Sequence, residues 1–325
     1  MKKKIERHLE TITELMDFLR GEKHVFIQLH NFPDHDAVSS GYGLQYLFKQ
    51  FGIVSHLVYE GELQRNSLKR VIMELNIELT HIDNAKMQKE DKIIIVDGCK
   101  GNKNVRDFHG DEVAIVDHHQ VACPEDVEFS DIRPGYGACS TIVASYFKEL
   151  DIKIPKEIAT TFMIGINTDT SHLTRSFSKQ DQETYFECYS IADIEYLNSI
   201  LRNYIEVQDL RFYQYLINNM RYFKRTAFCY FPDGCDKNLL GILGDYALAL
   251  DKVDFVTLCA RNGTVINFSV RNENLEWDAS RLIDEVLKGV GFSGGHAEMA
   301  GGIINDQKKF DKEVLLNRLN TLLYP

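Results

Sequence analysis

The chain has 325 residues, more than a single hydrophobic core usually supports, so we expect two domains. Its hydrophobic content of 44% is ordinary for a globular protein, and a formal net charge of −11 argues against a protein that coats long duplex nucleic acid. The seven cysteines form no CxxC pair, and we find neither a signal-peptide pattern nor an apolar run of about 18 residues. These features predict a cytoplasmic protein with reduced thiols and no membrane segment.

The first half of the chain alternates β-rich runs with helical patterns. The β-rich runs occupy residues 24–29, 53–59, 91–97 and 112–117, and helical patterns follow the first run and lie near 65–76. Strands that alternate with helices predict βαβ units and a parallel sheet. The apolar residues at 93–96 and 114–116 do not alternate with polar ones, as expected for strands buried on both faces. Residues 139–166 predict two further helices, the second opened by Pro155.

The second half begins with a long helical pattern over residues 179–224, which we interpret as a connection between domains. β-rich runs follow, and the segment "RNGTV" predicts a hairpin turn between two of them. A helical pattern at 311–323 ends the chain. The expected fold class is therefore α/β, with an N-terminal parallel-sheet domain at 1–185, a helical connector at 186–224 and a smaller C-terminal α/β domain at 225–325.

Acidic residues and histidines follow three of the predicted strands at the point where each strand ends. In open parallel sheets ligands bind beyond the carboxyl ends of the strands, so we expect these side chains to gather at one edge. A fourth segment, "GINTDT", adds an acid in a polar loop after the predicted helix 156–166. The candidate ligands are His30, Asp34, Asp36, Asp97, His118 and Asp169, with Asp117 and His119 beside them.

Each of these motifs has an ordinary alternative when taken alone. The "PDHD" turn could be a solvated β-turn, and the acid of "GINTDT" could cap a helix. Their shared position at strand ends favours a metal site instead. The set is rich in oxygen ligands and lacks thiolates, which suits Mn²⁺ or Mg²⁺ better than structural zinc. The acids outnumber the needs of one ion, so we expect two ions that share a carboxylate.

The segments "HNFPDHDA", "VDG", "DHH" and "GINTDT" resemble, in this order, the four motifs of the DHH phosphoesterase superfamily. The segment "GFSGGHAEMAGG" at 291–302 is similar to the glycine-histidine signature of its accessory DHHA1 domain. The resemblance therefore implies a DHH domain at 1–185 and a DHHA1 domain at 225–325. The size and layout look like the stand-alone branch that contains the nano-RNases and adenosine 3′,5′-bisphosphate phosphatases.

The resemblance also implies a centre of two Mn²⁺ ions, or of two Mg²⁺ ions. One ion would bind His30, Asp34 and Asp97. The other would bind Asp36, Asp97, His118 and Asp169, so that Asp97 bridges the two ions. Among the catalytic residues that the resemblance implies, His119 faces the scissile phosphate and Asp117 orients the imidazoles, as carboxylates commonly do beside metal-bound histidines.

Substrate contacts are implied in the accessory domain by Gly294, Gly295, His296 and Arg271. Glycine allows backbone N–H groups close to a phosphate, and the arginine fork suits the same group. The sequence departs from the superfamily pattern where Ser171 follows "TDT" in place of a glycine, and where Ser293 replaces the first glycine of the terminal motif. These departures leave the metal ligands intact and affect the substrate pocket. Arg175 nearby is either a further phosphate contact or a surface residue.

The leading hypothesis is an Mn²⁺-dependent phosphodiesterase or phosphatase that uses metal-activated water. Its expected substrates are nano-RNA, linear dinucleotides and adenosine 3′,5′-bisphosphate. The alternatives are a cyclic di-AMP phosphodiesterase, a RecJ-type single-strand exonuclease, and a nucleotide-binding regulator without catalysis. A family II pyrophosphatase would carry a different C-terminal domain. The expected partners are short nucleotides, with no duplex nucleic acid and no membrane, and the sequence leaves the oligomeric state open, a homodimer included.

Overall fold

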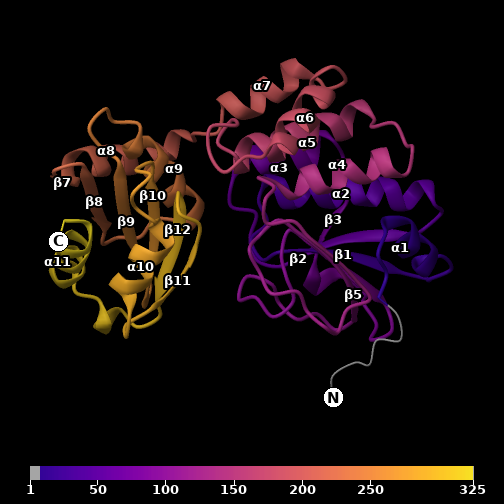
Figure 1. The fold of residues 1–325 in the computed structure, drawn as a ribbon, viewed down its shortest axis with the longest axis horizontal. Helices are drawn as coiled ribbons and strands as arrows, with labels where there is room; N and C mark the ends of the chain where they lie inside the picture. Colours follow the sequence, from indigo (N-terminus) through magenta and orange to yellow (C-terminus); the bar gives the residue numbers. More distant parts are fainter. Residues whose placement is uncertain (1–7, 325) are drawn as a thin grey trace. The chain divides into compact units, whose positions relative to one another are not determined.

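The computed structural model describes residues 8–324, and the chain divides after Tyr204 into two compact units (Figure 1). The division falls inside the predicted connector at 186–224. Among the described residues, no helix is both long enough and apolar enough to span a membrane. Each unit has its own sheet and its own hydrophobic core, and each is described separately below.

The first unit is built on a sheet whose strands pair in parallel throughout, in the order β3-β2-β1-β4-β5-β6. This confirms the parallel sheet that the sequence predicts. The order reverses between β1 and β4, which makes the carboxyl ends of these two strands the topological switch point where ligands bind in such sheets. The strands are β1 (Val25–Leu29), β2 (Ser55–Tyr59), β3 (Leu79–His81), β4 (Lys92–Val96), β5 (Asp111–Asp117) and β6 (Phe129–Ile132).

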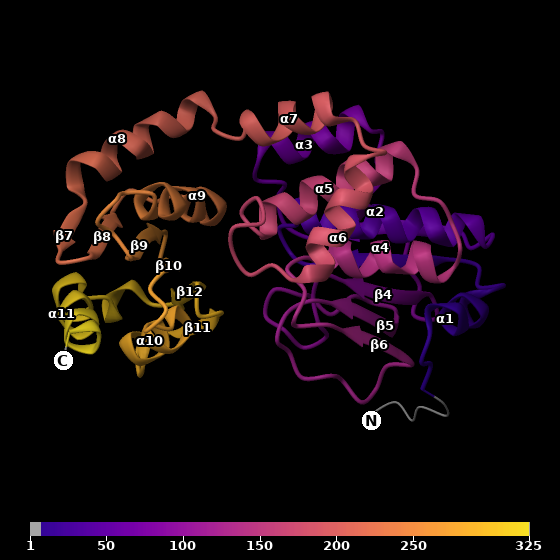
Figure 2. The same cartoon turned by 45° about the horizontal axis from the view of Figure 1, so that its top comes forward.

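Helices cover one face of this sheet, as Figure 2 shows, and loop residues cover the other. Ile27 and Ile94 point into the helix-covered core, whereas Phe26 and Ile95 pack on the opposite face with loop residues such as Phe108. Burial on both faces explains the unbroken apolar runs in the sequence. The helices are α1 (Ile12–Leu19), α2 (His35–Gln50), α3 (Asn66–Glu74), α4 (Cys139–Glu149), α5 (Lys156–Asp169), α6 (Lys179–Tyr189) and α7 (Ile194–Arg202).

Helix α5 extends further than the sequence pattern predicts. The pattern placed Asp169 in a loop after a helix that ends at residue 166, but Asp169 is the last residue of α5. The hydroxyls of Thr168 and Thr170 donate hydrogen bonds to carbonyls of the preceding turn, at Ile164 and Ile166. The backbone N–H of Thr170 also donates to the carbonyl of Ile166, which continues the helix beyond its apolar residues and keeps Asp169 on a helical turn.

The second unit has a mixed sheet in the order β11-β12-β10-β9-β8-β7, in which only the β8–β9 pair is parallel among the described strands. The predicted "RNGTV" hairpin is confirmed between β9 and β10. The strands are β7 (Arg221–Phe223), β8 (Thr226–Phe231), β9 (Phe255–Asn262), β10 (Val265–Asn272), β11 (Phe292–Gly295) and β12 (Met299–Ile304). The helices are α8 (Leu210–Asn219), α9 (Lys237–Leu248), α10 (Ala279–Leu287) and α11 (Lys312–Leu323).

Two features of the second unit differ from the local sequence pattern. The helical pattern extended to residue 224, but Arg221–Phe223 form the short strand β7, which pairs with β8. The glycine-rich segment near 294 is a strand pair, β11 with β12, in antiparallel register. β7 and β11 are each held in place by pairing with a neighbouring strand. Such pairing leaves no local periodicity in the sequence from which these strands could be predicted.

Candidate metal centre

The loop after β1 places the first two candidate ligands. Asp34 caps α2, because its Oδ1 accepts hydrogen bonds from the backbone N–H groups of Asp36 at 3.0 Å and Ala37 at 3.1 Å. Its second oxygen, Oδ2, lies 3.7 Å from His30 Nε2. His30 Nδ1 lies 3.0 Å from the carbonyl of Asn31, which can only accept a hydrogen bond, so Nδ1 carries a proton. In the neutral ring the lone pair is then on Nε2, which faces the acids.

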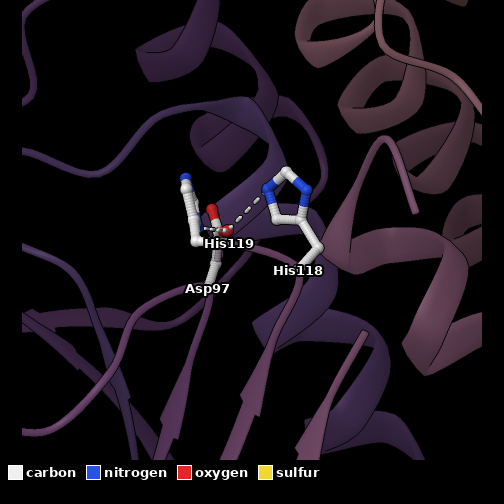
Figure 3. A group of neighbouring side chains, drawn as sticks. All are labelled: Asp97, His118 and His119. Atoms are coloured by element: carbon white, nitrogen blue, oxygen red, sulfur yellow. Dashed lines mark ion pairs between the residues drawn. The ribbon is translucent and has the colours of Figure 1, made fainter. Parts of the chain in front are cut away.

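Asp97 lies at the end of β4, between the histidines of two different loops. Its Oδ2 is 3.7 Å from His30 Nε2. Its Oδ1 is 3.4 Å from His118 Nε2, an ion pair drawn in Figure 3. The residue is 1% exposed and has a φ of +57°, a left-handed conformation that costs a non-glycine residue about 1–3 kcal/mol. Its backbone N–H donates to the carbonyl of Val116 on β5. The adjacent strand therefore supports the strained turn that points this carboxylate into the site.

The end of β5 contributes a carboxylate and two imidazoles. Asp117 Oδ1 accepts hydrogen bonds from both the Nδ1 of His119, at 2.8 Å, and its backbone N–H, at 3.1 Å. His118 Nδ1 lies 3.2 Å from the carbonyl of Tyr136, so this ring also carries its proton on Nδ1 and directs Nε2 toward the acids. His118 is buried, whereas the side chain of His119 is 42% exposed. The two rings therefore have different surroundings although they are adjacent in sequence.

Helix α5 brings Asp169 to the same place, with its Oδ2 3.4 Å from His118 Nε2. Asp36, on the first turn of α2, is fully buried against this helix. Gly165 allows the approach, since a Cβ there would lie 2.7 Å from Asp36 Oδ1. The Asp36 carboxylate also accepts N–H groups from Cys139 at 2.6 Å and Ser140 at 3.0 Å. It therefore caps α4, whose own N-cap residue makes no side-chain hydrogen bond.

All six candidate ligands thus gather at the carboxyl edge of the first sheet. Their ligand atoms form three groups in which every atom lies within 4.8 Å of the others. Asp97 belongs to two of these groups and His118 to two. The groups are His30 with Asp34 and Asp97, Asp36 with His118 and Asp169, and Asp97 with His118 and His119.

The electrostatics of the cluster indicate a missing positive charge. Burial and the neighbouring acids Asp169 and Asp97 raise the pKa of Asp36 well above its usual range, and burial and Asp34 raise that of Asp169 to about 6. Burial opposes the charged form of His30, but Asp34 and Asp97 outweigh it and raise its pKa to about 10. Without a cation the cluster therefore retains protons on its imidazoles and on some of its carboxyls.

Two buried atoms of the cluster also favour a bound cation. Asp97 Oδ1 and His118 Nε2 form no hydrogen bond with any of residues 8–324, although each is shielded from solvent. The two atoms face each other at 3.4 Å, and one metal ion could bind both of them. Carboxylates with imidazole Nε2 atoms, each ring fixed through Nδ1, are a donor set that fits Mn²⁺ or Mg²⁺.

Four of the five predicted substrate residues belong to the second unit. In the second unit the guanidinium of Arg271 is buried, with Nε 2.7 Å from Asp245 Oδ1. Gly295 has a φ of +144° and lies against β12, where a Cβ would be 2.4 Å from the carbonyl of Met299. The N–H of His296 donates to the same carbonyl, while Gly294 has open space around it. These four assignments therefore remain predictions.

Arg175, the fifth predicted substrate contact, belongs to the first unit and follows an unusual turn. Ser171, His172 and Leu173 all have positive φ angles, between 50° and 61°. Ser171 thus occupies a left-handed position at the place where the superfamily pattern has glycine, which is a local cost that the sequence alone did not reveal. The N–H of Arg175 donates to the carbonyl of Thr170, which closes this turn next to Asp169.

Sequence reasoning missed the backbone groups that orient the ligands. The carbonyl of Tyr136 fixes the ring of His118, and the N–H groups of Cys139 and Ser140 hold Asp36. The only available signal was a helix that starts at 139 without a capping side chain. The capping partner lies 103 residues away in the chain, so no local pattern could identify it.

Comparisons with known proteins agree with this arrangement. Residues 24–166 match the family described as the DHH family, N-terminal domain. An uncharacterized protein of Methanocaldococcus jannaschii is 25% identical over 281 residues, which cover 86% of this chain and 58% of that protein. A probable manganese-dependent inorganic pyrophosphatase of Streptococcus thermophilus is 30% identical over 149 residues, which cover 45% of this chain and 48% of that protein. The chain thus spans about half the length of these curated relatives.

Solved structures share the fold. An exopolyphosphatase-related protein from Bacteroides fragilis superimposes with a TM-score of 0.79 at 17% identity, covering 96% of this chain and 98% of that one. RecJ from Thermus thermophilus, in complex with Mn²⁺, superimposes with a TM-score of 0.57 at 14% identity, covering 96% of this chain and 54% of that one. At these identities the likeness concerns the fold alone.

Proposed function

We propose that the chain belongs to the DHH family, whose N-terminal domain matches residues 24–166, and that it is a divalent-metal-dependent phosphoesterase that hydrolyses linear dinucleotides and other short oligonucleotides. Adenosine 3′,5′-bisphosphate is a further proposed substrate. The observation that carries the proposal is Asp97, a buried carboxylate with one oxygen directed at each of two groups of potential metal ligands. The manganese dependence named for the Streptococcus thermophilus relative supports Mn²⁺ as the ion.

The three groups support the two ligand sets that we propose. His30, Asp34 and Asp97 would hold one ion, and Asp36, His118 and Asp169 together with Asp97 would hold the other. When bound, two such ions activate a water molecule for attack on phosphorus and offset the charge that develops on the phosphoryl oxygens. The chain's own contribution is to hold these ligands at fixed positions before the substrate arrives, through the Nδ1–H bonds of His30 and His118 to backbone carbonyls.

His119 is the residue that we assign to the phosphate itself. Its ring is anchored by Asp117 through Nδ1, and its side chain is more exposed than that of His118. Burial lowers the pKa of His119, but the hydrogen bond to Asp117 outweighs this and raises it, which favours a ring that carries protons on both nitrogens. Nε2 can then donate a hydrogen bond to a phosphoryl oxygen and stabilise its developing charge.

The central test replaces the shared carboxylate. Asp97→Asn should abolish hydrolysis and lower the number of tightly bound Mn²⁺ ions, measured by elemental analysis after gel filtration. Asp83→Asn is the matched control, because Asp83 is exposed and its carboxylate contacts only His81 among the described residues. Near-normal turnover with a full complement of metal in Asp97→Asn would reject the two-ion centre.

The substrate class needs a separate screen with Mn²⁺. It should contain linear di- to pentanucleotides, adenosine 3′,5′-bisphosphate, cyclic di-AMP and inorganic pyrophosphate. We expect the highest kcat/KM on the linear dinucleotides. A preference for cyclic di-AMP would select the cyclic-dinucleotide phosphodiesterase instead, and activity on pyrophosphate alone would replace the oligonucleotide proposal. Tight nucleotide binding with no product from any substrate would indicate a regulator without catalysis.

A further inference from the structure

A pocket in the first unit lies outside the metal-ligand cluster. Its volume is about 580 Å³, which falls within the roughly 300–1,000 Å³ of typical small-molecule sites. Its walls come from the end of α5, the turn that follows it, α6 and α7. The polar and aromatic residues that line it are Asn167, His172, Tyr185, Tyr189, Asn198, Arg202 and Tyr204.

The last turn of α5 separates this pocket from the cluster. Asp169 and Asn167 are two residues apart, and at 3.6 residues per turn their side chains leave the helix about 200° from each other. Asp169 faces His118, whereas Asn167 lines the pocket. His172, from the left-handed turn after the helix, lies with its Nδ1 3.1 Å from Asn167 Oδ1. The pocket and the cluster are thus neighbours around one helix end, about one helix diameter of 10 Å apart.

The pocket offers flat apolar walls. Tyr185, Tyr189 and Tyr204 line it, and the rings of Tyr185 and Tyr189 lie 6.4 Å apart and tilted by 38°. Tyr189 is 50% exposed and Tyr204 is 40% exposed, so their rings are accessible to a ligand. Aromatic side chains of this kind are the surfaces on which nucleobases stack.

The same pocket holds polar groups that the fold does not use. Within residues 8–324, the side chains of Arg202 and Asn198 make no hydrogen bond or ion pair. They lie one turn apart on α7, so both can reach one ligand. A guanidinium without a carboxylate partner is notable in a chain with a net charge of −11. It offers a phosphate two parallel donors, and the amide of Asn198 can pair with the edge of a base.

We propose that this pocket binds a nucleotide unit of the oligonucleotide substrate, with the base stacked on the exposed tyrosine rings and its phosphate on Arg202. The inference rests on the proposed function. A separation of about one helix diameter, roughly 10 Å, lets one strand place a phosphate at the metal ligands and a neighbouring nucleotide in the pocket. The pocket therefore engages a nucleotide that follows the one at the metal ligands, and adenosine 3′,5′-bisphosphate has no such second nucleotide.

The test compares a long and a short substrate. Arg202→Gln should raise KM for linear triadenylate by about ten- to a hundredfold, as expected for the loss of a charge-assisted contact, with kcat unchanged. KM for adenosine 3′,5′-bisphosphate should stay the same. Tyr189→Leu, which keeps apolar volume but removes the ring, should act in the same direction. Arg20→Gln is the control, because Arg20 is an exposed arginine of the same unit that pairs with Asp17.

Binding measured without turnover separates this inference from the proposed function. In EDTA, wild-type protein should bind triadenylate in equilibrium dialysis, and Arg202→Gln should bind it at least tenfold more weakly. If no substrate is hydrolysed but this difference remains, the proposed function fails and the pocket stands. Equal affinity in the wild type, Arg202→Gln and Tyr189→Leu overturns the pocket. A change in sedimentation in the same variants, with unchanged triadenylate affinity, would also overturn it and identify the surface as a contact between copies of the chain.

Discussion

Replacement of Asp36 tests whether one side chain both holds α4 and completes the candidate metal centre. In the structure its two oxygens accept the N–H groups of Cys139 and Ser140, and the residue is fully buried. Asp36→Ala leaves two buried donors without partners, at about 1–3 kcal/mol each. The replacement also removes the burial of a charge and the repulsion from Asp169 and Asp97, which together raise the pKa of Asp36. We therefore expect a net loss near the lower end, about 2 kcal/mol.

Asp36→Asn separates the two roles. The amide keeps one acceptor oxygen, so about half of the stability loss should remain, while the negative charge that a cation needs is gone. Urea unfolding in EDTA, followed by circular dichroism, should rank the wild type above Asp36→Asn and Asp36→Ala last. Both variants should bind less Mn²⁺ than the wild type. Equal unfolding midpoints of Asp36→Ala and the wild type in EDTA would refute the capping argument.

Three further predictions follow from other parts of the chain. Burial opposes the charged form of His30, but Asp34 and Asp97 raise its pKa from 6.5 to about 10, so above pH 6.5 the metal-free folded state holds a proton that the unfolded state releases. This contribution to stability should be full below pH 6.5 and be lost as the pH rises toward 10, measured by urea unfolding in EDTA; a rise in stability over this range would contradict the assignment. Asp117→Asn should lower kcat about 10–100-fold with unchanged Mn²⁺ content, because the Asp117 carboxylate holds the ring and the backbone N–H of His119; loss of metal would instead make Asp117 a ligand. Gly295→Ala should destabilise the chain by more than about 1 kcal/mol in thermal unfolding, whereas Gly294→Ala, with open space around it, should not; equal melting temperatures would argue against the close contact with Met299.

The capping contacts of Asp34 and Asp36 explain why a single ligand motif, taken alone, does not indicate a metal site. Asp34 caps α2 and Asp36 caps α4, so the "PDHD" turn does have the ordinary helix-capping role that its composition permits. The same two carboxylates also lie within reach of His30 and His118. Capping and metal binding are compatible because each carboxylate has several lone pairs, of which the backbone N–H groups use only some.

Arg271 illustrates a limit of motif matching in the second unit. Its position at the end of a β-rich run was predicted correctly, since it lies on β10. The burial of its guanidinium and its ion pair with Asp245 depend on α9 packing across the sheet, and neither is encoded near residue 271. Its role in substrate binding remains a prediction, because the ion pair places the guanidinium inside its own unit.

The sequence by itself determined the features that depend on local order. Apolar runs followed directly by acids and histidines predicted the strands of the first unit and the edge where His30, Asp97 and His118 meet, because parallel strands present their carboxyl ends on the same side. The tertiary structure alone decided how those side chains are held. The left-handed turn at Asp97, the carbonyl that orients His118 and the distant helix end that binds Asp36 all involve partners on other elements. Such pairings are set by packing between segments far apart in the chain, and no local pattern records them.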